Sequence, residues 1–235
     1  MWNNSLNLAV FNWISQYTSV SPHLNQIVQY VEGAYLFKGI PVMGLLWYFW
    51  FRDSDPKSNT RQLIIATLVG CLVAIFIARV ANHLAPFQPR PFANAALPYL
   101  SYIGLPEPDT QALFDWNSFP SDHAALFFSL GTGIFMISRV AGSFAYFYIL
   151  TFIALPRVYL GLHYPTDIFA GALLGIVCVA LSTRKRIATF YTDKCNILLS
   201  KYPAAFQAVL FIFSVEICVM FNDVRRFITL TKILF

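Results

Sequence analysis

The sequence predicts an all-α fold, a polytopic membrane helical bundle of about five to six transmembrane helices with an amphipathic N-terminal region. Only 11% of the 235 residues are charged and 57% are hydrophobic, whereas soluble domains carry about 25% charged residues. The mean hydropathy is +0.59, and the apolar residues gather in long runs. We therefore expect one membrane domain over residues 1–235.

The N-terminal region, residues 1–33, is expected to lie at the membrane interface. Apolar side chains there are interspersed with Asn, Gln and Ser, and the pattern breaks around Ser21-Pro22. The stretch is too polar to span a bilayer, so we expect one or two amphipathic helices.

Six later segments are candidates for membrane spans, each of which needs about 20 mostly apolar residues. They are residues 34–51, 63–85, 123–140, 143–161, 166–182 and 204–221. The last of them contains Glu216. We expect a helical core over 34–182, and a basic cytoplasmic loop, the sixth candidate span and a tail over 183–235.

Lysine and arginine residues indicate the orientation of the bundle. If all six segments span, the connections after the first, third and fifth share one side of the membrane. Their basic residues are Arg52, Lys57, Arg61, Arg139, Arg184, Lys185, Arg186, Lys194 and Lys201. The positive-inside rule makes that side cytoplasmic. We therefore expect a multi-pass protein of the cytoplasmic (inner) membrane whose 86–122 and 161–166 connections face the periplasm or outside.

Neither the basic charge nor the cysteines indicate a different class of partner. Basic residues that flank membrane helices account for the net charge of +5, so we expect contacts with membrane lipids and none with nucleic acid. No two of the 4 cysteines have metal-ligand spacing, and buried free thiols are expected.

The segment RVYLGLHYPTD, residues 157–167, concentrates reactive side chains. Pro165 is expected to open a helix, because proline suits a first helical turn and disfavours helix just before it. Arg157 then lies near the end of one helix, His163 in the connection and Asp167 at the start of the next. A carboxylate makes a nearby imidazole a better base or nucleophile, and arginine suits phosphate oxygens. The segment therefore indicates a phosphoryl-transfer site.

The long connection between the second and third candidate spans carries a second cation, Arg90, held between two prolines in QPRPF. Taken alone, Arg90 indicates an interfacial arginine that contacts lipid headgroups. Upstream, Arg79 and His83 are four residues apart on one helix face. For Arg79 the alternative is a side chain that snorkels to the interface.

A further polar cluster, SFPSDHAALFF at residues 118–128, stands where a candidate span begins. The free N–H groups and partial positive charge of a helix start suit phosphate oxygens. Ser121 or Asp122 could instead be an ordinary N-cap that needs no ligand. Capping does not explain His123. The predicted topology brings the polar helix ends to one membrane face, where they could line one pocket: Arg90, Ser121, His123, Arg157, His163 and Asp167.

In this order and spacing the motifs resemble the type 2 phosphatidic acid phosphatase family, whose signature is Lys-x6-Arg-Pro, then Pro-Ser-Gly-His, then Arg-x5-His-x3-Asp. The residues that match are Arg90, Pro91, Pro120, Ser121, His123, Arg157, His163 and Asp167. His83 stands in place of the lysine, and Asp122 in place of the glycine. The resemblance covers about residues 34–182.

SFPSDHA and the amphipathic N-terminal region are most similar to one subgroup, the bacterial undecaprenyl-pyrophosphate phosphatases of the bacitracin-resistance type. That resemblance implies a hydrolase that removes the terminal phosphate of a polyprenyl pyrophosphate lipid outside the cytoplasmic membrane. The product is the monophosphate used in cell-wall (peptidoglycan) biogenesis.

The resemblance also implies roles for the site residues. His163 would attack phosphorus and become a phosphohistidine while Asp167 holds its ring, and His123 would protonate the leaving group and then activate water. The expected phosphate-binding residues are Arg90, Ser121 and Arg157, joined by His83 and Asp122. Asp122 is expected to brace Arg90 or Arg157. The family needs no metal or other cofactor.

Three alternatives remain at the level of the sequence. The same motifs suit a phosphatase of phosphatidic acid or phosphatidylglycerol phosphate, because they define the phosphate chemistry and not the lipid tail. A metal-dependent hydrolase could use His83, His123, His163 and Asp167 as ligands. A non-catalytic lipid-binding or transport protein could use the same pocket.

Overall fold

The protein is an all-helical bundle in a computed structural model that describes residues 4–18, 21–52, 59–94, 97, 114 and 116–222. Three helical segments in this part of the chain are long and apolar enough to cross a membrane, namely Thr60–Leu84 (α5), Arg139–Tyr159 and Pro165–Ser182 (α10). Two shorter apolar helices are Asp122–Ile137 (α7) and Pro203–Cys218 (α12). The predicted all-α membrane fold is confirmed.

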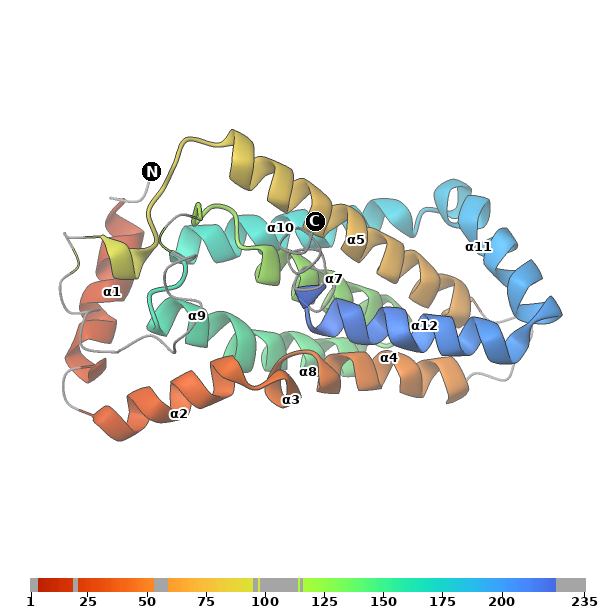
Figure 1. Cartoon of the computed structure of the whole chain (residues 1–235), viewed down its shortest axis with the longest axis horizontal. Coiled ribbons are helices and arrows are strands. Elements are labelled where there is room, and N and C mark those ends of the chain that lie inside the picture. The colour runs from red at the N-terminus through yellow and green to blue at the C-terminus, as the bar shows by residue number, and fades with distance from the viewer. Residues whose placement is uncertain are drawn as a thin grey trace, which may run out of the picture.

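Helices α5, α7 and α10 pack against one another at the centre of the bundle (Figure 1). The contact between α7 and α10 depends on glycine, because a Cβ at Gly171 would lie 2.3 Å from the Ser121 carbonyl oxygen. At Gly175 it would lie equally close, 2.3 Å, to the Ala125 carbonyl oxygen. Small residues let membrane helices approach this closely. The start of α7 is therefore held directly against α10.

The segment predicted as a span over 143–161 is helical over Arg139–Tyr159, with a change of helical geometry in its middle. It consists of α8 (Arg139–Ile149), the π-helical turn η3 (Leu150–Ala154) and α9 (Leu155–Tyr159). Pro156 lacks the N–H that would bond to the carbonyl of residue 152, so the regular α-helical ladder cannot continue there. The interruption lies immediately before Arg157.

The N-terminal region forms two helices, α1 (Ser5–Thr18) and α2 (Pro22–Gly33), as its polar pattern predicted. Ser21 caps α2 by accepting the Leu24 N–H at 3.3 Å. The predicted span 34–51 is divided into α3 (Tyr35–Lys38) and α4 (Ile40–Arg52). Pro41 disfavours helical geometry in the residue before it, and a Cβ at Gly39 would lie 2.9 Å from the Cys218 Cα.

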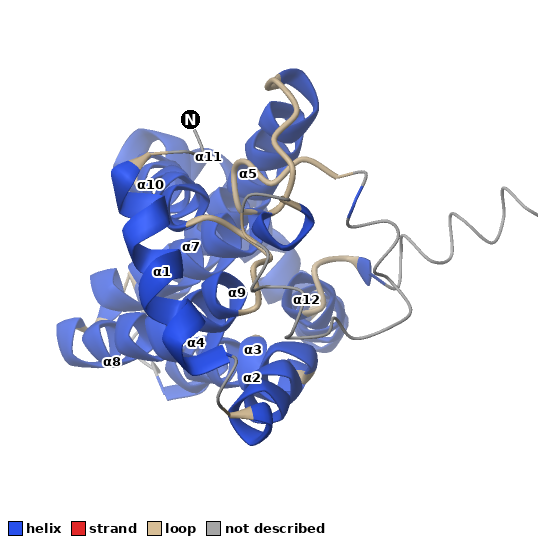
Figure 2. Cartoon of the chain, turned by 90° about the vertical axis from the view of Figure 1, so that its left-hand side faces the viewer, coloured by secondary structure: helices blue, strands red, loops and turns tan. Residues whose placement is uncertain are grey.

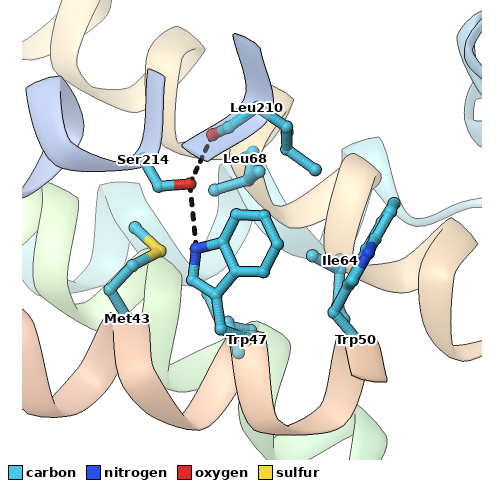
Figure 3. Close-up of a pocket in the computed structure, with 8 residues that line it drawn as sticks. Met43, Trp47, Trp50, Ile64, Leu68, Leu210 and Ser214 are labelled. Atoms are coloured by element: carbon cyan, nitrogen blue, oxygen red, sulfur yellow. Dashed lines mark hydrogen bonds between the residues drawn. The ribbon is translucent and has the colours of Figure 1, made fainter. Parts of the chain in front are cut away.

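The expectation of a basic loop after α10 is wrong, because Lys185–Lys201 forms a helix, α11. This stretch contains neither glycine nor proline to interrupt a helix. Helix α12 follows it and packs on α4 and α5. Figure 3 shows the contact, where Trp47 Nε1 donates to Ser214 Oγ at 3.2 Å among Met43, Leu68 and other apolar side chains.

Candidate active site

The polar motifs meet at one end of the bundle, where α5 and α9 end and α7 and α10 begin. This end is on the left in Figure 1 and faces the viewer in Figure 2, and helices α1 and α2 lie beside it. Arg61, Arg139 and Arg184 lie at the other end of the bundle, where α5 and α8 begin and α10 ends. Pro165 opens α10 and Arg157 lies in α9, as the sequence predicted.

His163 is almost fully buried, with 2% of its surface exposed, and both ring nitrogens have neighbours. Its Nδ1 lies 2.9 Å from the backbone carbonyl oxygen of Ser118. A carbonyl can only accept, so Nδ1 carries the proton and the lone pair of the neutral ring is on Nε2. Nε2 lies 3.3 Å from Nη1 of Arg90. The reactive nitrogen therefore faces a phosphate-binding type of side chain.

The electrostatic surroundings of His163 favour the neutral imidazole. Burial is the main reason that the pKa of His163 lies below its ordinary value, and the positive charge of Arg90 adds to the shift. Asp167 acts in the opposite direction. A neutral ring with its lone pair on Nε2 is the form that can attack phosphorus once phosphate oxygens take over the Arg90 Nη1 contact.

Asp167 is completely buried, and its carboxylate ties three segments together. Oδ2 accepts from Ser118 Oγ at 2.5 Å and from the Tyr164 N–H at 2.9 Å. Gln88 Nε2 approaches Oδ1 at 3.4 Å. Oδ2 is 3.8 Å from His163 Nδ1, too far for a hydrogen bond. Asp167 therefore acts on the histidine through its charge and through Ser118, whose carbonyl holds the ring directly.

Arg90 is brought to His163 by the QPRPF segment. Its Nη1 donates to the Leu162 carbonyl oxygen at 2.8 Å, and the Phe92 N–H donates to the Gly161 carbonyl oxygen at 3.0 Å. Gly161 has a positive φ of 67°, a conformation that glycine adopts without strain. The tight turn at Gly161 thus connects the QPRPF segment to the turn that carries His163.

Arg157 is buried in α9 and is paired with a residue that the sequence analysis did not identify. Its Nη2 lies 2.9 Å from Oε1 of Glu32, which comes from α2. The Nε atoms of Arg157 and Arg90 are buried without a hydrogen-bond partner among the described residues. Buried donors are normally paired in native structures, so both arginines retain capacity to bind phosphate oxygens.

The start of α7 carries the remaining motif residues. Ser121 is the N-cap, and its Oγ accepts the Ala124 N–H at 3.3 Å. Asp122 Oδ1 lies 3.0 Å from His123 Nδ1, which leaves His123 Nε2 to exchange a proton. Among the described side chains, Asp122 contacts His123 and neither arginine, so the expected brace to Arg90 or Arg157 is not found.

A cavity of about 440 Å³ opens beside His163. Its lining includes four of the predicted residues and Arg79: Arg79, His83, Arg90, Asp122 and His163. Asn117 also lines it and fastens its wall, because Asn117 Nδ2 donates to the carbonyl oxygens of Asn82 at 3.1 Å and Ala85 at 3.3 Å. Within the described part of the chain, no three His, Cys, Asp or Glu side chains are grouped closely enough to hold a metal.

Sequence reasoning missed five polar residues that organise the site: Glu32, Lys38, Gln88, Asn117 and Ser118. Gln88 and Ser118 lie inside the motifs QPRPF and SFPSDHAALFF, so position alone could have drawn attention to them. Glu32 lies far from every motif, and its sequence neighbourhood contains no sign of a partner in α9.

Comparisons with known proteins agree with these motifs. The family model described as PAP2 superfamily matches residues 85–190. The chain is 30% identical over 176 residues to BcrC, the bacitracin transport permease protein of Bacillus licheniformis, covering 74% of this chain and 77% of BcrC. YbjG of Escherichia coli K12, named as a candidate undecaprenyl-diphosphatase, is 25% identical over 174 residues, which cover 74% of this chain and 79% of YbjG. An undecaprenyl-diphosphatase of Sulfolobus acidocaldarius is 30% identical over 142 residues, which cover 58% of this chain and 57% of that protein.

The chain therefore belongs to the PAP2 superfamily, as a membrane phosphatase.

Proposed function

We propose that the protein removes the terminal phosphate of lipid pyrophosphates, with undecaprenyl pyrophosphate as its substrate, through a phosphohistidine on His163. The observation that carries the proposal is the orientation of this histidine. Its Nδ1 is 2.9 Å from the Ser118 carbonyl oxygen and its Nε2 is 3.3 Å from Arg90 Nη1. That orientation leaves the nucleophilic lone pair beside a cation, where phosphate oxygens would bind.

The first step transfers the terminal phosphoryl group to His163. Nε2 forms a bond to phosphorus while the bond from phosphorus to the bridging oxygen breaks. His123 gives its Nε2 proton to that oxygen, so the lipid monophosphate leaves without an unfavourable charge. Arg90 and Arg157 offer their unpaired Nε–H groups to the oxygens that gain charge.

The second step returns the enzyme to its starting state. A water molecule attacks phosphorus on the opposite side from His163, and His123 takes the proton from that water. The bond between nitrogen and phosphorus breaks, and inorganic phosphate leaves. Asp122, 3.0 Å from His123 Nδ1, stabilises the charged ring before the first proton transfer and after the second.

Two further observations support the substrate and the outward orientation. Relatives of this chain are named as an undecaprenyl-diphosphatase and a candidate for that activity. Arg61, Arg139 and Arg184 lie at the opposite end of the bundle from His163, which by the positive-inside rule supports a site on the outer face of the cytoplasmic membrane.

The test is phosphate release by the purified protein in detergent from undecaprenyl pyrophosphate, with phosphatidic acid in parallel and EDTA throughout. We expect release from the pyrophosphate that survives EDTA and is lost, by about 10⁴-fold or more, in His163→Ala. His23→Ala, which removes an exposed histidine of α2, is the matched control and should retain activity. A rapid denaturing quench should also recover acid-labile phosphate on the wild-type protein.

Each contrary outcome has a defined meaning. Preference for phosphatidic acid would retain the mechanism and overturn the substrate. Loss of release in EDTA that returns with added metal would favour the metal-dependent alternative. If neither lipid released phosphate, the proposed phosphatase activity on both lipids would be wrong.

A further inference from the structure

Helix α2 packs against the protein with its polar side. Its buried residues are Asn25 and Glu32, which are seven positions apart and so lie on one helix face. The apolar Ile27 and Tyr30 are 60% and 67% exposed. Amphipathic helices of soluble proteins bury the opposite face. Helix α2 thus turns this face inward because of its polar contacts and not because of apolar burial.

Both inward residues of α2 contact the short helix that carries Arg157. Asn25 Oδ1 accepts a hydrogen bond from Tyr159 Oη at 2.7 Å. Glu32 Oε1 accepts from Arg157 Nη2 at 2.9 Å. Tyr159 and Arg157 belong to α9, which follows a π-helical turn and is only five residues long. Helix α2 therefore holds α9 in place, where the preceding π-helical turn interrupts the regular α-helical hydrogen bonds.

Lys38 of α3 completes a buried cluster of three charges. Its Nζ lies 2.9 Å from the same Glu32 oxygen that binds Arg157. Arg157, Lys38 and Glu32 are 6%, 8% and 9% exposed. Burial alone would raise the pKa of the Glu32 carboxyl, but the charges of Arg157 and Lys38 bring that pKa below its ordinary value. One carboxylate thus holds two cations, and the cluster retains a net positive charge.

We propose that Glu32 is a positioning residue of the active site, which holds the Arg157 guanidinium in the orientation that binds the transferring phosphoryl group. Lys38 keeps Glu32 in place. This inference rests on the phosphatase activity proposed above. It extends the working site to α2 and α3, which lie outside residues 85–190, the part matched by the family model.

The rival explanation is that the cluster contributes only to stability. Two double variants separate these explanations, because both remove Lys38 and both keep the cluster's net charge unchanged. Glu32→Gln with Lys38→Met retains an oxygen that can accept from Arg157, whereas Glu32→Met with Lys38→Met does not. Asp193→Asn, which neutralises an exposed carboxylate of α11, is the control.

The experiment measures kcat, KM and the thermal midpoint in detergent for each variant, on whichever lipid phosphate the wild-type protein hydrolyses. We expect kcat of the Glu32→Met/Lys38→Met variant to fall about 100-fold, since misplacement of a catalytic group by about 1 Å costs that much. KM should change less than about threefold, because the lost interaction is strongest in the transition state. The kcat of the Glu32→Gln/Lys38→Met variant should remain within about tenfold of the wild-type value. The kcat of the control should equal the wild-type value.

Equal kcat values in the two double variants would overturn the proposal and leave a structural cluster. If the variant with methionine at both positions does not fold, Glu32→Asp carries the test, because it draws the carboxylate back from Arg157. An unchanged kcat in Glu32→Asp would then overturn the proposal.

A second readout is independent of the lipid. Orthovanadate mimics the transferring phosphoryl group and should raise the thermal midpoint of the wild-type protein. The Glu32→Met/Lys38→Met variant, or Glu32→Asp in its place, should need about tenfold more orthovanadate for the same increase. If no lipid is hydrolysed, the proposed function fails, and the vanadate titration still decides the role of Glu32.

Discussion

Two regions of this bundle, the apolar contact around Trp47 and the site around His163, differ in cavity volume and in the pairing of their polar atoms. Around Trp47, where α4, α5 and α12 meet, apolar side chains leave a cavity of only about 10 Å³, and the Trp47 N–H donates to Ser214 (Figure 3). At the site, a cavity of about 440 Å³ lies beside Arg90 and His163. The Nε atom of buried Arg90 has no partner among the described residues.

Two of the buried side-chain atoms without a partner among the described residues, Nε of Arg90 and Nε of Arg157, belong to the site, and the third is Oε2 of Glu216 in α12. Closely packed interiors leave few voids and pair their donors. Departures from that rule concentrate at functional sites, where the missing partner is a ligand. Substitutions at the site should therefore affect mainly catalysis, and substitutions at the apolar region mainly stability.

The largest effect among them is expected for Asp167→Asn. The amide can still accept from the Tyr164 N–H, but it removes the negative charge and weakens the 2.5 Å hydrogen bond from Ser118. We expect kcat to fall about 100-fold with the fold retained. The expected loss of kcat is smaller than the loss of about 10⁴-fold known for a carboxylate that is hydrogen-bonded to its histidine. The reason is that Asp167 Oδ2 lies 3.8 Å from His163 Nδ1. A loss of about 10⁴-fold would instead indicate direct contact during the reaction.

Gly171→Ala should follow in size. The new Cβ would lie 2.3 Å from the Ser121 carbonyl oxygen, so the start of α7 must move away from α10. We expect kcat to fall by about 30-fold, since displaced catalytic groups lose much of their effect. Gly44→Ala in α4 is the control, because nothing lies within 4 Å of its Cβ position. Equal activity in the two variants would contradict the close α7–α10 contact.

The pH dependence tests the state of His163. Its pKa lies below the ordinary value, mainly through burial and also through Arg90, and the neutral ring is the active form. The acid limb of the profile, with a decline of about tenfold per pH unit, should therefore lie below the ordinary value of about 6.5, whereas any alkaline limb reports loss of the proton that His123 donates. The measurement is kcat/KM against pH, with the ionisation of the substrate titrated separately. An acid limb centred above that value would show that the ring is not neutral as we infer.

The smallest effect on activity is expected at the apolar region. Ser214→Ala removes the acceptor of the Trp47 N–H and should cost about 1 kcal/mol of stability. The thermal midpoint in detergent should decrease while kcat stays within about twofold of wild type. A large loss of activity would instead show that the α4–α12 contact affects the site.

Local chemistry explains how much of the protein could be predicted from its sequence. Apolar run length indicated the membrane helices, proline indicated the start of α10 at Pro165, and the break at Ser21-Pro22 marked the boundary between α1 and α2. The order and spacing of the motifs were sufficient to place Arg90, His163 and Asp167 in one site. These properties depend on side chains that are neighbours in the chain or on helix polarity, so no tertiary information is needed.

The remaining features depend on contacts between segments that are distant in sequence. The partner of His163 Nδ1 is a backbone carbonyl, at Ser118, and every residue has a carbonyl, so the sequence could not single this one out. Glu32 is 125 residues from Arg157, and its role exists only because α2 turns its polar face towards α9. Composition and motifs therefore determined the membrane bundle and the reacting groups, whereas tertiary packing decided which atoms orient them, because hydrogen bonds and buried charges depend on distances that only the folded chain defines.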